Sequence, residues 1–240
     1  MPVPDFSWVG WNKHTPPWCE LHAQMAAAGQ LVPWPNRTQL AYFSGGMQSG
    51  NSRKELKALY DGSQEARRLL KVRDVSPSFY TLSARDREGK DSAEPLARAC
   101  AYSYLLSVPG FGYSNRLKAL LLCGSPVIHI DAGSPREFFM PLLQPDRHFI
   151  VVARTKQVIQ AVQRLRANAT LARKIGRAGR RLALSQLTME RALGYLRALF
   201  ASYSSIQRER VDIGDSASAL DAAGYRQVDS VAAAAAATRS

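Results

Sequence analysis

Residues 104–124 read YLLSVPGFGYSNRLKALLLCG, and this stretch decides the fold. The apolar run 104–108 predicts a buried strand, and residues 109–113, rich in proline and glycine, predict a tight loop. A helix is expected to follow, with Ser114 at its N-cap position. A strand, a loop and a helix in this order are typical of a parallel α/β unit.

The segments on either side continue the alternation of strand and helix. We expect strands at 39–43, 127–130 and 149–152, and helices at 20–28, 53–60, 64–72, 135–143, 155–167, 170–184 and 189–208. Thr155, Asn168 and Thr188 are expected to cap the last three helices, and the charged residues 83–95 to form a surface loop. This spacing predicts an α/β fold with a parallel sheet covered by helices on both faces.

The two ends of the chain differ in composition from this middle part. Residues 1–37 are rich in tryptophan and proline and carry no core of their own, so we interpret them as the remnant of an N-terminal domain. Residues 38–208 are expected to form the parallel α/β part, a Rossmann-like domain, together with its C-terminal helices. Residues 209–240, which contain a polyalanine run, are expected to be a disordered tail.

Composition and charge limit the classes of function. The chain has 240 residues, of which 46% are apolar, a composition typical of a globular protein. Its formal net charge of +13 favours an anionic ligand, a nucleic acid or an acidic membrane surface. No apolar run reaches the roughly 20 residues of a membrane-spanning helix, and the N-terminus lacks the pattern of a signal peptide. Arg173, Arg177, Arg180 and Arg181 are interpreted as the solvated face of an amphipathic helix, so no nucleic-acid partner is expected.

The loop and helix start at residues 110–116 have the features of an anion site. Unpaired backbone N–H groups and the positive end of the helix dipole would point at one spot there, where Ser114 adds a hydroxyl. Arg116 falls in the first helical turn, where a cation is unfavourable by up to roughly 1 kcal/mol unless an anion docks beside it. The alternative is that Arg116 simply extends into water.

The glycine spacing leaves the kind of nucleotide open. Gly110 and Gly112 match two of the three glycines of the dinucleotide fingerprint, but Asn115 stands where the third belongs. Asp131 ends the next expected strand, near the usual position of a ribose contact. An oxidoreductase domain that binds a dinucleotide is therefore one hypothesis, and a different nucleotide fits as well.

Longer segments resemble one family when they are taken in order. They are PDFSW (4–8), WPNR (34–37), AYFSG (41–45), YSYLL (102–106), GFGYSNRLK (110–118), LLLCGS (120–125), EFFMPLLQP (137–145) and HF (148–149). The series resembles the Rumi-type protein O-glucosyltransferases and their capsule-associated relatives, glycosyltransferase family 90, over about residues 4–205. The resemblance implies a GT-B architecture whose C-terminal, Rossmann-like half binds a UDP-sugar, with the N-terminal acceptor domain largely missing from this chain.

The resemblance also implies a set of donor-binding residues. These are Phe111, Gly112, Tyr113, Ser114, Asn115 and Arg116, with Arg53 as a further cation and Glu137 as an acidic ribose contact. Ser44 stands where the family usually has an arginine. The family's catalytic base precedes the PDFSW segment, so it is expected upstream of Met1, and Asp5 is not its equivalent. The chain is then either a fragment or a homologue that binds the donor without efficient transfer.

The activity implied is that of a glycosyltransferase. It would transfer glucose or xylose from UDP-glucose or UDP-xylose to a hydroxyl of a protein or glycan acceptor, with no metal or other cofactor. The resemblance implies a disulfide between Cys100 and Cys123, which would place the protein in the endoplasmic reticulum or Golgi lumen. The alternative for these two cysteines is a pair of buried thiols, and Cys19 is expected to be free. An oxidoreductase domain and a basic nucleic-acid-binding module remain the other hypotheses.

Overall fold

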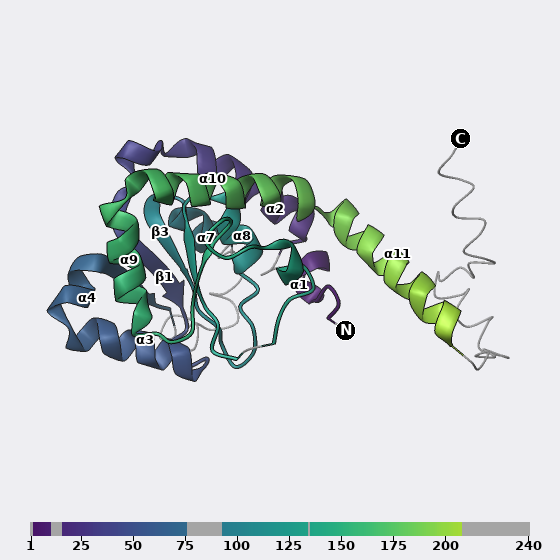
Figure 1. Cartoon of the computed structure of the whole chain (residues 1–240), viewed down its shortest axis with the longest axis horizontal. Helices are drawn as coiled ribbons and strands as arrows, with labels where there is room; N and C mark the ends of the chain where they lie inside the picture. Colours follow the sequence, from purple (N-terminus) through teal and green to yellow (C-terminus); the bar gives the residue numbers. More distant parts are fainter. Residues whose placement is uncertain (1, 11–15, 76–92, 134, 208–240) are drawn as a thin grey trace, which may run out of the picture. The chain divides into compact units, whose positions relative to one another are not determined.

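The computed structural model describes residues 2–10, 16–75, 93–133 and 135–207. Five strands of this part form one parallel sheet in the order β2-β1-β3-β4-β5 (Figure 1). Their bounds are β1 Thr38–Gly45, β2 Leu70–Asp74, β3 Tyr102–Ser107, β4 Val127–Ile130 and β5 Ile150–Val152. The register pairs Leu105 with Val127 and Ile128 with Ile150, so the strand ends align. The expected parallel α/β fold is confirmed.

Helices cover both faces of the sheet, as the sequence predicts. Tyr42 and Leu105 pack into one core and Phe43 and Leu106 into another, because successive side chains of a strand point to opposite faces. The first core is completed by α2 (Trp18–Leu31), α7 (Ala93–Ala99) and α8 (Leu117–Leu122), and the second by α3 (Asn51–Gly62), α4 (Gln64–Leu69) and α9 (Gln157–Ala167). The sheet is therefore buried on both sides.

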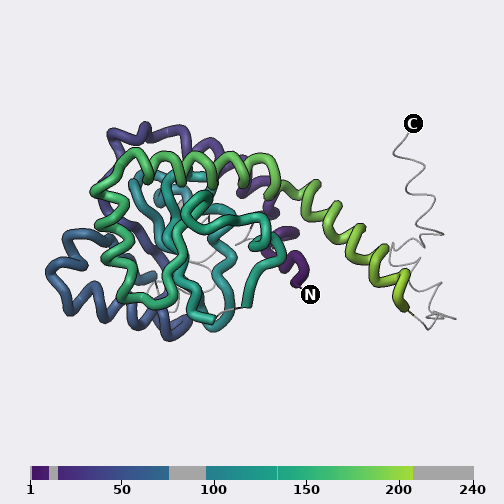
Figure 2. Tube along the Cα trace, in the orientation of Figure 1, coloured from purple at the N-terminus to yellow at the C-terminus, as the bar shows by residue number. Residues whose placement is uncertain are grey.

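The described part of the chain contains five further elements. They are the helices α1 (Phe6–Val9), α10 (Ala169–Gln186) and α11 (Met189–Ile206) and the 3-10 turns η2 (Trp34–Asn36) and η3 (Met140–Leu142). Figures 1 and 2 show α4 beside α9, where Gln163 Nε2 donates to Glu65 Oε1 at 2.6 Å. The chain divides into two compact units, Met1–Ala192 and Leu193–Ser240. The expected division after residue 37 stays a prediction, and the expected tail 209–240 lies outside the described residues.

Several expected elements have different bounds in the structure. The helix expected over 64–72 ends at Leu69, and the next five residues form the edge strand β2, in which buried and exposed side chains alternate. The last residues of the expected surface loop 83–95 begin α7, and residues 83–92 lie outside the described part. The expected helix 135–143 is wrong: this stretch contains η3 alone, because Pro141 lies inside it and has no N–H to donate to the carbonyl four residues before it.

Two of the three expected caps are confirmed. Asn168 Oδ1 accepts the N–H of Leu171 at 2.8 Å, and Thr188 Oγ1 accepts the N–H of Arg191 at 3.3 Å. Thr155 is not a cap, because its hydroxyl donates to Glu55 and α9 begins two residues later.

Arg180 corrects the interpretation of the basic helix face. Its guanidinium does not extend into water but donates to the carbonyl of Leu122 in α8 and, at 2.8 Å, to that of Ala26 in α2. Three helices are therefore joined by one side chain. Gly29 makes this approach possible, because a Cβ there would lie 2.4 Å from the Leu122 carbonyl oxygen.

Candidate functional site

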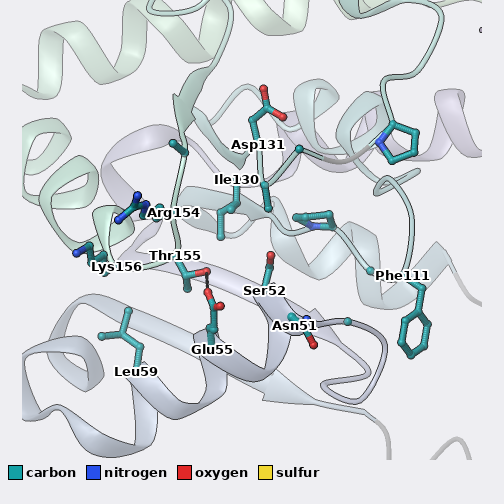
Figure 3. A pocket seen from close by; sticks show the side chains of 17 residues that line it. Asn51, Ser52, Glu55, Leu59, Phe111, Ile130, Asp131, Arg154, Thr155 and Lys156 are labelled. Carbon is teal, nitrogen blue, oxygen red and sulfur yellow. Dashed lines mark hydrogen bonds between the residues drawn. The ribbon is translucent and has the colours of Figure 1, made fainter.

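A pocket of about 1160 Å³ opens at the carboxyl ends of the strands (Figure 3). Its wall comes from the start of α3 and from the segments 109–111, 130–133 and 153–156, which follow or end β3, β4 and β5. The strand order reverses between β1 and β3, since the chain passes from β1 to β2 on one side and then to β3 on the other. In open parallel sheets the ligand binds in the crevice at such a switch point.

The first turn of α3 supplies backbone donors to this pocket. Gly50, Asn51 and Ser52 line it, and Gly50 is the N-cap. The first N–H groups of a helix have no partner within the helix, and the positive end of the helix dipole lies there. Gly50 has φ +148°, and a Cβ on it would lie 2.5 Å from the carbonyl oxygen of Gly110, so only glycine fits. This helix N-terminus suits an anion.

The helix start expected at Ser114 is wrong. α8 begins at Leu117 and has six residues, with Arg116 in the N-cap position and in the αR conformation. Ser114 caps nothing: its hydroxyl oxygen is buried and has no hydrogen-bond partner among the described residues. The helix N-terminus that borders the pocket is therefore that of α3, whose start lies two residues before the expected one at Arg53.

Arg53, which is buried, and Arg116, which is half-buried, form a cationic pair around Phe43. Their guanidinium carbons lie 5.6 and 5.5 Å from the centre of the Phe43 ring. Arg53 donates to the carbonyls of Gly46 (3.3 Å) and Val108 (3.4 Å), and Arg116 donates to the carbonyl of Ser44. Among the residues that the structure describes, no carboxylate contacts either guanidinium.

The environment of this pair disfavours positive charge. Burial, followed by the charge of Arg53, lowers the pKa of Arg116 to about 10, and burial also lowers the pKa of Arg53. Two desolvated cations without a counter-ion are costly, and a bound anion would offset that cost. Neither side chain lines the pocket; Arg53 lies behind Gly110, within 3.4 Å of where a Cβ would stand.

The other loop residues expected to bind the donor are spread over the site. Phe111 lines the pocket rim with 89% of its surface exposed, and Figure 3 shows its ring turned away from the other labelled side chains. Gly112 has open space where a Cβ would stand. Tyr113 donates its hydroxyl to Asp5, and burial and this bond raise the pKa of Tyr113. The carbonyl oxygen of Asn115 accepts a hydrogen bond from Lys118 Nζ at 3.2 Å.

Glu137 lies outside the pocket, in a buried polar cluster. Its Oε1 is 3.8 Å from Lys118 Nζ, and both side chains are less than a tenth exposed. Lys118 also donates to Ser7 Oγ at 2.5 Å and lies 5.2 and 5.4 Å from the ring centres of Trp8 and Trp18. Burial raises the pKa of Glu137 to about 7, although Lys118 opposes the shift. Glu137 is not among the residues that the structure brings to the pocket.

Several pocket residues were missed by the sequence analysis. They are Asn51, Ser52, Glu55, Arg154, Thr155 and Lys156. Asp131, considered there as a ribose contact, does line the pocket and accepts from Arg136 Nη2 at 3.2 Å. Asn51 and Ser52 could have been predicted from the polar residues that follow Gly50, because such residues fit the first turn of a helix.

The three cysteines form one disulfide and leave one free thiol. Cys100 and Cys123 are bonded, which links the end of α7 to the end of α8, and Cys19 is exposed and free. In the described ranges no group of three or more His, Cys, Asp or Glu side chains is arranged to hold a metal ion. No helix of the described part has the length and apolar character that a bilayer span requires.

A parallel sheet with helices on both faces and a pocket at its switch point is typical of the Rossmann-like class of α/β proteins. The family follows from comparison with known proteins: the model of glycosyl transferase family 90 matches residues 1–230. The chain belongs to that family, and the resemblance found in its motifs is confirmed.

Curated relatives and solved structures give the scale of the similarity. Protein O-glucosyltransferase 1 of Rattus norvegicus is 32% identical over 175 residues, which is 72% of this chain and 43% of the relative. Its Homo sapiens counterpart is 31% identical over 190 residues, which is 78% of this chain and 47% of the relative. The chain thus spans less than half the length of these relatives. Among solved structures, sucrose-phosphate synthase of Thermosynechococcus elongatus matches with a TM-score of 0.44 and 15% identity, over 79% of this chain and 43% of that protein. Anabaena Alr3699/HepE, solved in complex with UDP, matches with a TM-score of 0.43 and 14% identity, over 79% of this chain and 47% of that protein.

Proposed function

We propose that this chain is the donor-binding part of a GT-B glycosyltransferase, which binds UDP-glucose or UDP-xylose and transfers the sugar to a hydroxyl of a protein or glycan acceptor. The observation that carries the proposal is the pair of a buried Arg53 and a half-buried Arg116, whose partners among the described residues are backbone carbonyls and no acid. Membership of family 90 and the names of the curated relatives support the reaction class.

The diphosphate is the group that these residues suit. Its oxygens would replace the carbonyls of Ser44 and Gly46 as acceptors for the two guanidiniums, which offer charge-assisted hydrogen bonds. The N–H groups at Asn51 and Ser52 would bind it from the pocket side. Because Gly50 packs against Gly110 between the pocket and the arginines, the proposal includes a displacement of this contact by the ligand. The same cations would stabilise the charge that develops on the departing UDP.

The proposal extends to conditions and compartment. We infer that donor binding needs no metal ion, since the guanidiniums and the helix N-terminus supply the positive charge that a cation would otherwise bring. Addition of a chelator is then expected to leave UDP affinity unchanged. The Cys100–Cys123 bond supports a lumenal compartment of the secretory pathway, because disulfides persist where the environment is oxidising.

The test is thermal unfolding of the chain with added ligands. UDP and UDP-glucose are expected to stabilise it, by about 2.7 kcal/mol at a hundred times the dissociation constant, whereas NAD and RNA are not. Arg116→Gln should lose the stabilisation by UDP, and Arg173→Gln, which removes an exposed arginine of α10, should keep it. Stabilisation by NAD in place of UDP, or an unchanged UDP effect in Arg116→Gln, would refute the assignment.

A further inference from the structure

Two acidic side chains of the described residues line the pocket, and they differ in their partners. Asp131 accepts from Arg136 Nη2 at 3.2 Å, so a cation already compensates its charge. Glu55 has a neutral partner, because Thr155 Oγ1 donates to Glu55 Oε2 at 2.8 Å. Figure 3 shows the two side chains meeting inside the pocket. The second carboxylate oxygen of Glu55 has no bonded partner in the described part of the chain, so it can accept from a ligand.

Thr155 fixes this carboxylate from the opposite wall. Thr155 is 3% exposed and belongs to the turn before α9, whereas Glu55 belongs to α3. The hydrogen bond therefore crosses from the β5 side of the pocket to the β1 side. A carboxylate held in this way presents its free oxygen in one direction, which is the condition for selective hydrogen bonding.

The order of groups along α3 indicates what Glu55 contacts. Asn51 and Ser52 lie in the first turn, Glu55 follows about one turn later, and Leu59 about one turn after that; all four line the pocket, on one helical face. The first position favours an anion, the second a hydroxyl donor, and the third, at Leu59, an apolar group. A carboxylate repels a phosphate, so the phosphates and Glu55 occupy different turns.

That sequence of environments corresponds to diphosphate, ribose and base in a nucleotide. The transferred sugar lies on the other side of the diphosphate and has no apolar group beyond it, so it does not fit the same order. We propose that Glu55 binds the ribose hydroxyls of the donor nucleotide and that Thr155 positions its carboxylate. This inference rests on the proposed function, and it assigns the ribose contact to Glu55 rather than to Glu137, which is buried against Lys118.

The test compares nucleotides with and without ribose hydroxyls by isothermal titration calorimetry. Glu55→Gln is expected to weaken UDP binding roughly ten- to a hundredfold, because a hydrogen bond to a charged acceptor is lost, and to weaken 2′,3′-dideoxy-UDP binding less than about threefold. Thr155→Val should reduce the preference for UDP over dideoxy-UDP by a smaller factor. An equal loss for both nucleotides, or no loss, would overturn the ribose assignment.

Matched variants separate this inference from its alternatives. Glu65→Gln removes an exposed carboxylate of α4 outside the pocket and should bind both nucleotides as the parent chain does. Asp131→Asn is expected to retain most of the preference for UDP; if it loses that preference and Glu55→Gln does not, the ribose contact belongs to Asp131. Failure of the unaltered chain to bind UDP would refute the proposed function itself, before the ribose question arises.

Discussion

Replacing Lys118 by methionine tests the buried polar cluster that Lys118 forms with Glu137 and Ser7. The change keeps an unbranched side chain of similar length but removes the charge that faces Glu137 and the hydrogen bonds to Ser7 and Asn115. Removing one partner of a buried ion pair costs about 3–5 kcal/mol, because the other charge stays buried without compensation. The cation–π contacts with two tryptophan rings are lost as well, each contributing about 0.5–2 kcal/mol.

The cost of this change depends on pH through Glu137. Burial places the pKa of Glu137 at about 7, above its ordinary value of 4.5, so the folded protein binds this proton more tightly than the unfolded chain. Stability from Glu137 is therefore fully present below pH 4.5 and is lost as pH rises through about 7. Lys118 holds this pKa down, so its removal raises it further. We expect Lys118→Met to cost about 3–5 kcal/mol at pH 8 and roughly 1.4 kcal/mol less at pH 5, because the parent Glu137 is ionised over only about one pH unit of this range.

Urea unfolding followed by tryptophan fluorescence measures both values, since Trp8 and Trp18 pack beside Lys118. The double variant Lys118→Met with Glu137→Gln removes both charges and is expected to recover most of the loss at pH 8. A loss below about 1 kcal/mol at pH 8, or the same loss at both pH values, would refute the reasoning that an uncompensated carboxylate causes it.

Three further predictions concern the frame of the site. Reduction of the disulfide should lower the free energy of unfolding by about 3 kcal/mol, because the bond joins two residues that are 23 positions apart and so restricts the unfolded chain. Urea unfolding with and without dithiothreitol measures this loss. Gly50→Ala should cost about 1–3 kcal/mol in the same assay, since its φ of +148° and the carbonyl of Gly110 leave no room for a Cβ; an unchanged midpoint would contradict this. Arg180→Gln should lower the melting temperature, whereas Arg173→Gln should change stability by less than about 0.5 kcal/mol; equal effects would show that the Arg180 bonds to α8 and α2 contribute nothing.

The layered fold could be predicted because apolar runs and turn residues alternate clearly around β3 and β4. β2 could not: the run QEARRLLKVRD continues a helical pattern, and its last five residues are a strand because they pair with β1. A short edge strand depends on its neighbour more than on its own composition. The expected helix 135–143 failed for a related reason, since its apolar residues Phe138 and Phe139 pack on Trp8 without helical backbone.

The site was predicted in part. Arg116 was named from the loop and helix start at residues 110–116, and Arg53 from the family resemblance. The structure brings the two together around Phe43. Glu55 and Thr155 were missed because they are a hundred residues apart, and the strand register that aligns the ends of β1 and β5 is a tertiary property. The buried position of Glu137 could have been predicted from Lys118. This lysine is the one charged residue of the apolar helix LKALLL, and a buried charge requires a partner.

The bond between Cys100 and Cys123 makes a closed covalent ring out of β3, the loop at Gly110 and all of α8. A protease that cuts after Arg116 would open this ring without releasing either piece. The two fragments would stay joined through the disulfide, and a nicked molecule would run as one species in electrophoresis until a reductant separates them.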